Sequence, residues 1–111
     1  MEKIEKYRQI IQEILSRHAG YKEGVEGIEA QTIFDTVHDH YQLVHVGWRN
    51  RRRVYGCVVH IDIKAEKIWI QHDGTEIGVA NELVEQGVPK TDIILGFHIP
   101  YRRQFTEFAV E

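Results

Sequence analysis

Residues 41–72 decide the fold, and they read YQLVHVGWRNRRRVYGCVVHIDIKAEKIWIQH. Within this stretch, residues 41–49, 54–64 and 67–72 are rich in valine and isoleucine, which fit the pleated surface of a β-strand. The segments between them, 50–53 and 65–66, are short enough to be hairpin turns. We therefore predict a three-stranded antiparallel meander.

The period of two along a strand sorts these side chains onto two predicted faces. One face is almost entirely apolar and is expected to pack on the helices. Its members are Val44, Val46, Trp48, Cys57, Val59, Ile61, Ile63, Ile68 and Ile70. The other face mixes aromatic and polar side chains. Its members are Tyr41, Leu43, His45, Val58, His60, Asp62, Trp69 and Gln71. The mixed face suits partner binding, because aromatic side chains with a polar group give large contact areas; the alternative is a terminal segment that covers it.

Helical patterns flank the meander on both sides. In residues 2–18, apolar side chains recur every three or four positions, as in an amphipathic helix. Asp73 and Glu76 have the spacing of a capping box that opens a second helix, and Gly87 ends it. The predicted buried stripe of this helix is Ile77, Ala80, Leu83 and Val84. Residues 20–31 are predicted as a loop, 32–37 as a candidate short strand, 93–97 as a short strand or buried turn, and 105–110 as an edge strand or packed arm. The result is a single α+β domain over residues 1–111.

Composition and charge narrow the function classes. The formal net charge is −3, whereas a domain that holds nucleic acid mainly through phosphate contacts is usually basic. No window approaches the ~20 apolar residues of a membrane-spanning helix. The single cysteine, Cys57, excludes an intrachain disulfide, and its apolar neighbours predict a buried side chain. We expect a cytoplasmic protein.

The densest histidine stretch raises the question of a metal site. His38 and His40 lie two residues apart and share one side of an extended segment. Zinc needs three or four converging ligands, and no second pair with suitable spacing supplies the rest. Aspartate and histidine before a strand are more typical of turns and backbone caps. We expect no bound metal and no cofactor.

A second polar constellation lies on the middle predicted strand, where His60, Asp62 and Lys64 share one face. An acidic residue two positions before a lysine in such a strand resembles Mg²⁺-dependent nucleases of the restriction-endonuclease type, in which the lysine assists the attacking water. A further carboxylate would have to come from Asp39 or Glu76. An ordinary strand with cross-strand ion pairs explains the same residues more simply.

The tip of the predicted hairpin carries a basic patch. Its arginines are Arg49, Arg51, Arg52 and Arg53. Guanidinium groups form bidentate hydrogen bonds with phosphates and with carboxylates. The patch therefore predicts contact either with nucleic acid or with an acidic protein surface, and the sequence leaves both open.

Ordered blocks along the whole chain resemble the XisI family. They are DHYQLV (39–44), VGW (46–48), RVYG (53–56), HIDIK (60–64), KIWIQ (67–71), DGTE (73–76), GVPKTD (87–92), LGFH (95–98) and FTEF (105–108). The resemblance implies an fdxN-element excision controlling factor, a regulatory protein in heterocyst differentiation that accompanies a separate recombinase. It also implies an XisH-type partner protein. It supplies no catalytic residues.

The leading hypothesis is therefore a non-enzymatic control factor that binds a partner such as an XisH-type protein. The predicted contact residues are the four arginines of the hairpin together with Tyr41, His45, His60 and Trp69 of the mixed face. The alternatives are a metal-dependent nuclease that uses Asp62 and Lys64, and direct DNA binding through the arginines. A homo-oligomer is left open.

Overall fold

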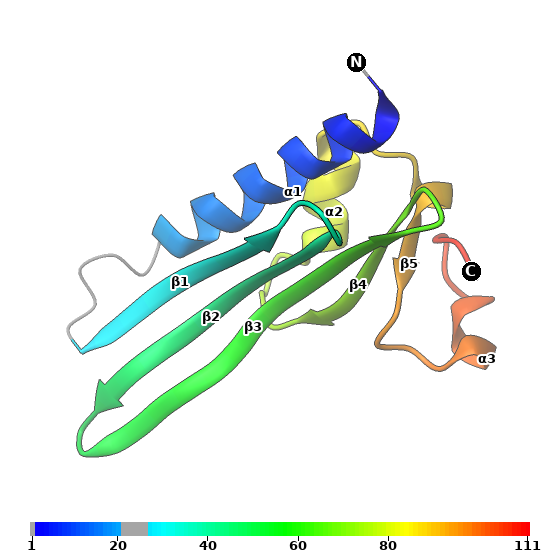
Figure 1. Ribbon diagram of the computed structural model, residues 1–111. Helices are drawn as coiled ribbons and strands as arrows, with labels where there is room; N and C mark the ends of the chain where they lie inside the picture. The colour runs from blue at the N-terminus through cyan, green and yellow to red at the C-terminus, as the bar shows by residue number, and fades with distance from the viewer. Residues whose placement is uncertain (1, 21–26) are drawn as a thin grey trace.

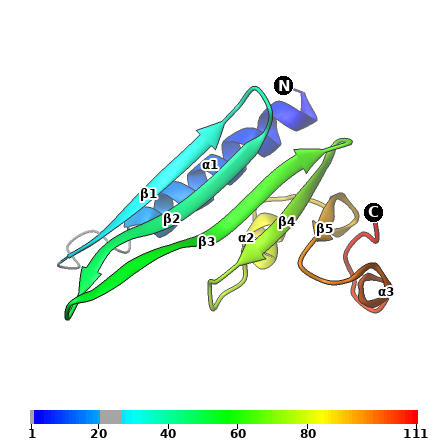
Figure 2. The same cartoon turned by 60° about the horizontal axis from the view of Figure 1, so that its bottom comes forward.

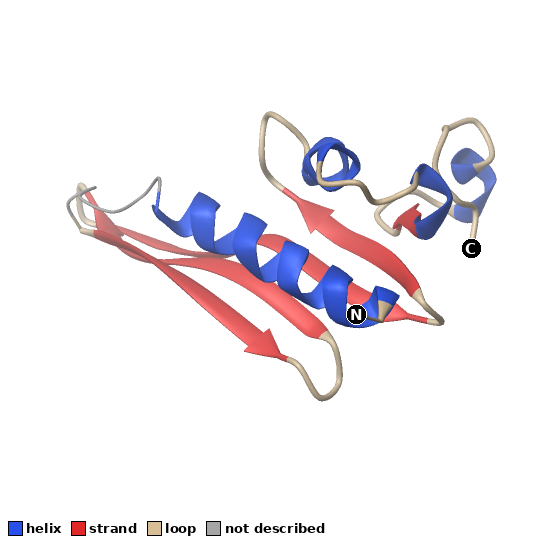
Figure 3. Cartoon of the chain, turned by 90° about the horizontal axis from the view of Figure 1, so that it is seen from above, coloured by secondary structure: helices blue, strands red, loops and turns tan. Residues whose placement is uncertain are grey.

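The computed structural model describes residues 2–20 and 27–111, and one five-stranded sheet organises them. The strands are β1 (Ile28–Asp35), β2 (His40–Arg49), β3 (Arg52–Lys64), β4 (Lys67–Asp73) and β5 (Ile93–Leu95), and they lie in this order across the sheet. The helices are α1 (Lys3–Gly20), α2 (Val79–Glu85) and α3 (Pro100–Arg103), with a short 3₁₀ helix at Lys90–Asp92. Both α1 and α2 lie on one side of the sheet (Figures 1 and 3). The α+β class is confirmed.

The predicted meander exists as β2, β3 and β4, which pair antiparallel. The predicted number of strands is wrong, because β1 and β5 extend the sheet on both sides. Strand β1 pairs antiparallel with β2 from Ile28 opposite Gly47 to Asp35 opposite His40. It overlaps the predicted candidate strand at residues 32–37, but it begins at Ile28, inside the segment 20–31 that was predicted as a loop. Residues 21–26 of that predicted loop lie outside the described residues. The outward positions of β1 are mostly polar, so its first half lacks a valine-rich or isoleucine-rich pattern. Strand β5 has three residues and pairs parallel with β4, so its connection needs the crossover that α2 provides.

The core lies between the sheet and the two helices. Helix α1 contributes a buried stripe at the predicted spacing, and α2 contributes Val79 and Leu83. The buried residues of α1 are Tyr7, Ile10, Ile11, Ile14 and Leu15. At the end of α1, His18 Nε2 lies 2.6 Å from Oε2 of the buried Glu82, which ties α1 to α2. Among the described residues, no helix combines the length and hydropathy needed to cross a membrane.

A β-bulge in β3 breaks both predicted faces, so that residues predicted to share a face lie on opposite sides of the sheet. Leu43 pairs with Val59 but Val44 pairs with Cys57, so Val58 is an extra residue in β3. The extra residue shifts the alternation of side chains along β3 by one position. Val59 and the four isoleucines of β3 and β4 are buried as predicted, but their neighbours on β2 are Tyr41 and Leu43, which are 0% and 1% exposed.

Three remaining members of the predicted apolar face, Val44, Val46 and Trp48, lie on the opposite side, which we call the open face. It is the side of the sheet away from α1 and α2, and Figure 2 looks onto it with both helices behind. Trp48 is 58% exposed and Cys57 is exposed, so the prediction that they pack on the helices is wrong. By the same register, Val44 and Val46 lie on the open face, where Val44 is buried by its neighbours.

The segment between β4 and α2 differs from the predicted capping box. Asp73 accepts hydrogen bonds from the backbone N–H groups of Thr75 and Val79, so it organises the turn and the helix start. Helix α2 begins only at Val79, and Ile77 is 61% exposed, so its predicted burial is wrong. The predicted stop at Gly87 is confirmed, because its φ of 100° is the left-handed conformation that glycine adopts at helix ends.

Candidate functional site

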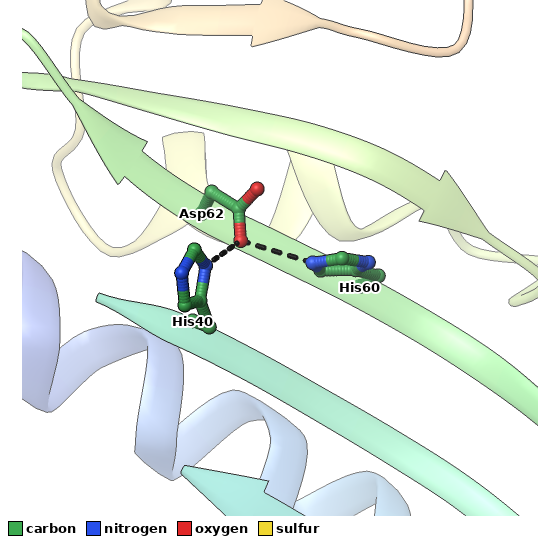
Figure 4. A group of neighbouring side chains, drawn as sticks. All are labelled: His40, His60 and Asp62. Atoms are coloured by element: carbon green, nitrogen blue, oxygen red, sulfur yellow. Dashed lines mark hydrogen bonds and ion pairs between the residues drawn. The ribbon is translucent and has the colours of Figure 1, made fainter. Parts of the chain in front are cut away.

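Three polar side chains converge on the open face where β2 begins. His40 is the first residue of β2 and lies directly opposite Asp62 of β3. His60 comes two residues before Asp62 and shares its face of the sheet. Figure 4 shows both imidazole rings directed at the carboxylate of Asp62. The hairpin register therefore assembles the cluster from residues that are 22 positions apart in the sequence.

Both histidines contact the same carboxylate oxygen. His40 Nδ1 lies 2.8 Å and His60 Nε2 lies 2.9 Å from Asp62 Oδ1. Gln71 of β4 donates a hydrogen bond of 3.2 Å from Nε2 to the other oxygen, Oδ2. Asp62 is only 7% exposed, and a buried carboxylate requires such partners. The carboxylate is thus held from three adjacent strands.

The charges of the cluster depend on one another. Burial raises the pKa of Asp62, but the hydrogen bond from His40 and the interactions with His60 and Gln71 outweigh burial, so the pKa lies below its ordinary value. The hydrogen bond with Asp62 in turn raises the pKa of His40. The arrangement therefore favours an ionised carboxylate beside an imidazole that holds its proton more tightly than usual.

An open pocket of about 380 Å³ lies over the cluster. Its lining residues are Ile33, Asp35, His40, Gln42, His60 and Asp62. Asp35 faces this pocket but is already engaged, because it accepts hydrogen bonds from the backbone N–H groups of Val37 and His38 and contacts the His38 ring. His38 thus binds Asp35, and it is His40 alone of the predicted pair that reaches the cluster.

Two of the residues named in the nuclease hypothesis make other contacts in the structure. The Lys64 ammonium lies 4.6 Å from the centroid of the Trp69 ring. Asp39 is bound by Arg8 at 2.8 Å and by the Tyr41 hydroxyl at 2.8 Å. In the part of the chain that the structure describes, the only group of three metal-binding side chains contains one carboxylate, that of Asp62. Neither predicted helper, Asp39 or Glu76, joins it.

The predicted contact residues of the mixed face fall on both sides of the sheet. Tyr41 is fully buried in the core, so its assignment to a partner surface is wrong. By the alternation of β2, His45 lies on the helix side with Tyr41 and Leu43, where it lines a cavity of about 650 Å³ together with His18. His60 and Trp69 do lie on the open face. Trp69 is partly covered there, because the Arg103 guanidinium lies 5.3 Å from its ring centroid.

The C-terminal segment accounts for that cover. Ala109 N–H donates to the Ile93 carbonyl, and an isolated bridge joins Ala109 to Ile94, so residues after α3 form the predicted packed arm along β5. Ile94 is consequently 0% exposed. At the other end of the sheet, Ile33, Trp48 and Tyr55 on the open face are 50%, 58% and 74% exposed. The arm therefore covers the open face at β4 and β5 but not at β1 to β3.

The arginines lie at the far end of the same surface. Asn50 and Arg51 make the tight turn between β2 and β3, with φ angles of 48° and 68°. Arg53 stands opposite Trp48, and its guanidinium is 5.4 Å from the centroid of a Trp48 ring. All four predicted arginines are exposed, at the end of the molecule remote from the C-terminus (Figure 1). We call these four residues the arginine tip.

The sequence singles out all three residues of the cluster, but it does not predict that they lie together. Spacing along one strand groups His40 with His38 and Asp62 with Lys64, because it is the only distance that the sequence contains. The missing information was the register that sets His40 opposite Asp62. A histidine and an aspartate two apart on one strand, with another histidine at the start of the preceding strand, is the pattern that would have found it.

Comparisons with known proteins give a consistent result over the full length. The profile of the family described as XisI protein matches residues 1–110. A crystal structure of an XisI-like protein from Anabaena variabilis is 41% identical, with a TM-score of 0.91, and the match covers 99% of this chain and 100% of that one. The fdxN element excision controlling factor XisI from Anabaena variabilis is 35% identical, with a TM-score of 0.86 and the same coverage. No curated protein matches the sequence.

Proposed function

Because this chain belongs to the XisI family, we propose that it is an accessory factor that controls the excision of a DNA element by binding a partner protein. A solved relative carries the description fdxN element excision controlling factor, which supports the connection with excision. The mode of action and the XisH-type identity of the partner are our inference. The observation that carries it is the exposed surface formed by the open face at β1 to β3 and the arginine tip.

The chemistry of this surface suits a protein partner with an acidic patch. Trp48 and Tyr55 are large amphipathic side chains of the kind enriched at interfaces, and both are more than half exposed. The arginine tip adjoins them and offers forked donors to carboxylates. The aromatic residues would supply buried area, whereas the arginines would supply orientation and a faster association rate.

Direct DNA binding is the second candidate function, since the same arginines fit phosphates equally well. The net charge of −3 makes a broad phosphate-binding surface less favourable than a local acidic protein contact. The two functions differ in salt dependence and in the need for an XisH-type protein. A single titration series therefore separates them.

The test is the affinity of the purified chain for an XisH-type protein, measured by calorimetry, and for a labelled DNA duplex, measured by fluorescence anisotropy. The variant R51E/R52E reverses two charges of the arginine tip. The matched control K6E/R102E makes the same change in net charge at exposed positions on α1 and α3. We expect the tip variant to weaken protein binding by about tenfold or more, in the range of interface arginines, and the control to change it little.

Two outcomes would contradict the proposal. Equal affinities for the XisH-type protein in the wild type, the tip variant and the control would remove the arginine tip from the interface. Tight duplex binding that falls steeply between 50 and about 200 mM salt, without any affinity for the protein, would favour the DNA-binding function.

A further inference from the structure

The two histidines and the aspartate on the open face form a donor set of the kind that holds a transition metal. One nitrogen of His40, one nitrogen of His60 and one oxygen of Asp62 all lie within 4.8 Å of one another. Two imidazoles and one carboxylate, with further positions left to water, is a ligand set found in zinc sites and in other first-row metal sites. Magnesium and calcium prefer sites built mainly from oxygen ligands.

The spacing of the donors is close to what such an ion requires. Zinc–nitrogen and zinc–oxygen bonds of about 2.1 Å in a tetrahedral arrangement place neighbouring donors roughly 3.4 Å apart. His40 Nδ1 and His60 Nε2 are 2.8 and 2.9 Å from Asp62 Oδ1. Small rotations of the two rings, each moving a nitrogen by roughly 0.5 Å, would open the space for the ion without a change in the strands.

The surroundings fix the donors in place. Asp62 and His40 are register partners in paired strands, so their Cα positions are set by the sheet. Gln71 Nε2 occupies the second oxygen of Asp62 at 3.2 Å, which leaves Oδ1 as the atom directed at both imidazoles. A hydrogen bond that orients a ligating carboxylate is a common support of metal sites. The pocket of about 380 Å³ over the cluster provides both an entry path and room for water ligands.

We propose that His40, His60 and Asp62 bind one divalent transition-metal ion, with zinc as the preferred ion, and that the remaining coordination positions face the pocket. The inference rests on the geometry of the cluster and is independent of the role in excision control. In the metal-free protein the same three side chains are held together by the two hydrogen bonds to Asp62. Zinc would replace those hydrogen bonds with coordinate bonds to the same atoms, and each ring nitrogen that donates to Asp62 would lose its proton to its other ring nitrogen or to solvent.

The test uses protein without a histidine tag, stripped of metal with a chelator and titrated with ZnCl₂ in a calorimeter at pH 7. We expect one zinc ion per wild-type chain. H40A and D62N should each weaken binding by at least about tenfold, because each removes a ligand or its charge, and Q71A should weaken it by about ten- to a hundredfold through the loss of orientation. H38A is the matched control, since His38 is an exposed histidine two residues from His40 that contacts Asp35.

Two-dimensional NMR of the imidazole groups gives a second readout that does not depend on variants. Zinc should shift the ring signals of His40 and His60 and leave those of the other five histidines in place. His40 is exposed, so H40A is expected to fold even if D62N does not. The proposal is overturned if the wild type shows no saturable one-to-one binding. It is also overturned if H40A binds zinc as tightly as the wild type, or if zinc shifts histidines outside the cluster.

Discussion

Leu43 gives the sharpest test of which side of β2 faces the core. The structure places Leu43 in the core beside Val59, where it is 1% exposed. The sequence instead predicted that the other side of β2, which carries Trp48, faces the core. Leu43→Ala removes buried methyl groups and leaves a cavity, which costs about 2–5 kcal/mol at buried sites. Domains of this size are stable by about 5–15 kcal/mol in total. The substitution should therefore remove a large part of the free energy of unfolding.

Urea denaturation followed by circular dichroism measures this loss. With a slope of about 1.5 kcal/mol per molar urea, a loss of about 3 kcal/mol lowers the midpoint by about 2 M. Trp48→Ala is the control on the opposite side of the strand. It should cost less than about 1 kcal/mol, because Trp48 is 58% exposed and its packed contact is the Arg53 guanidinium. A larger loss for Trp48→Ala than for Leu43→Ala would refute the register.

Two further substitutions test the packing of β2 and its link to α1. Gly47→Ala should lower the free energy of unfolding by about 1–3 kcal/mol, because the added Cβ would lie 1.9 Å from the Gly27 carbonyl oxygen. Gly56→Ala is the control and should cost far less, because no atom lies near the added Cβ. Equal urea midpoints for the two variants would contradict this prediction. Arg8 holds the pKa of Asp39 below its ordinary value. The pair therefore stabilises the fold fully at pH values above the unfolded-state pKa of about 4. This stabilisation is lost as the pH falls through the lower pKa of the folded state. Asp39→Asn should flatten the dependence of the urea midpoint between about pH 5 and pH 2, and an unchanged slope would show that the pair does not contribute.

The parts of the fold that the sequence predicted are those with a strong local pattern. The amphipathic stripe of α1, the β2–β3–β4 meander and the stop of α2 at Gly87 each follow from a few neighbouring residues. Strands β1 and β5 overlap the segments predicted as a candidate strand at 32–37 and as a short strand or buried turn at 93–97. Their local patterns are too short or too polar to show which strand each one pairs with. These two strands are defined by pairing with their neighbours, which is tertiary information.

The candidate site was less predictable for the same physical reason. One inserted residue, Val58, moves Tyr41 from a surface role to the core and brings Trp48 to the open face. Short-range alternation cannot reveal a bulge, because it assumes an unbroken period of two. The arginine tip was predicted correctly as an exposed hairpin, since a turn rich in charges needs no tertiary context. The cluster around Asp62 depends on register alone.

The most direct test of the central claim is hydrogen–deuterium exchange of the chain with and without an XisH-type protein. We expect the complex to slow exchange in residues 46–57, which include the arginine tip and the exposed aromatic residues of the open face. Exchange along the solvent side of α1 should stay as it is in the free chain. Absence of any complex, or protection confined to α1 and α2, would contradict the claim that this surface binds the partner.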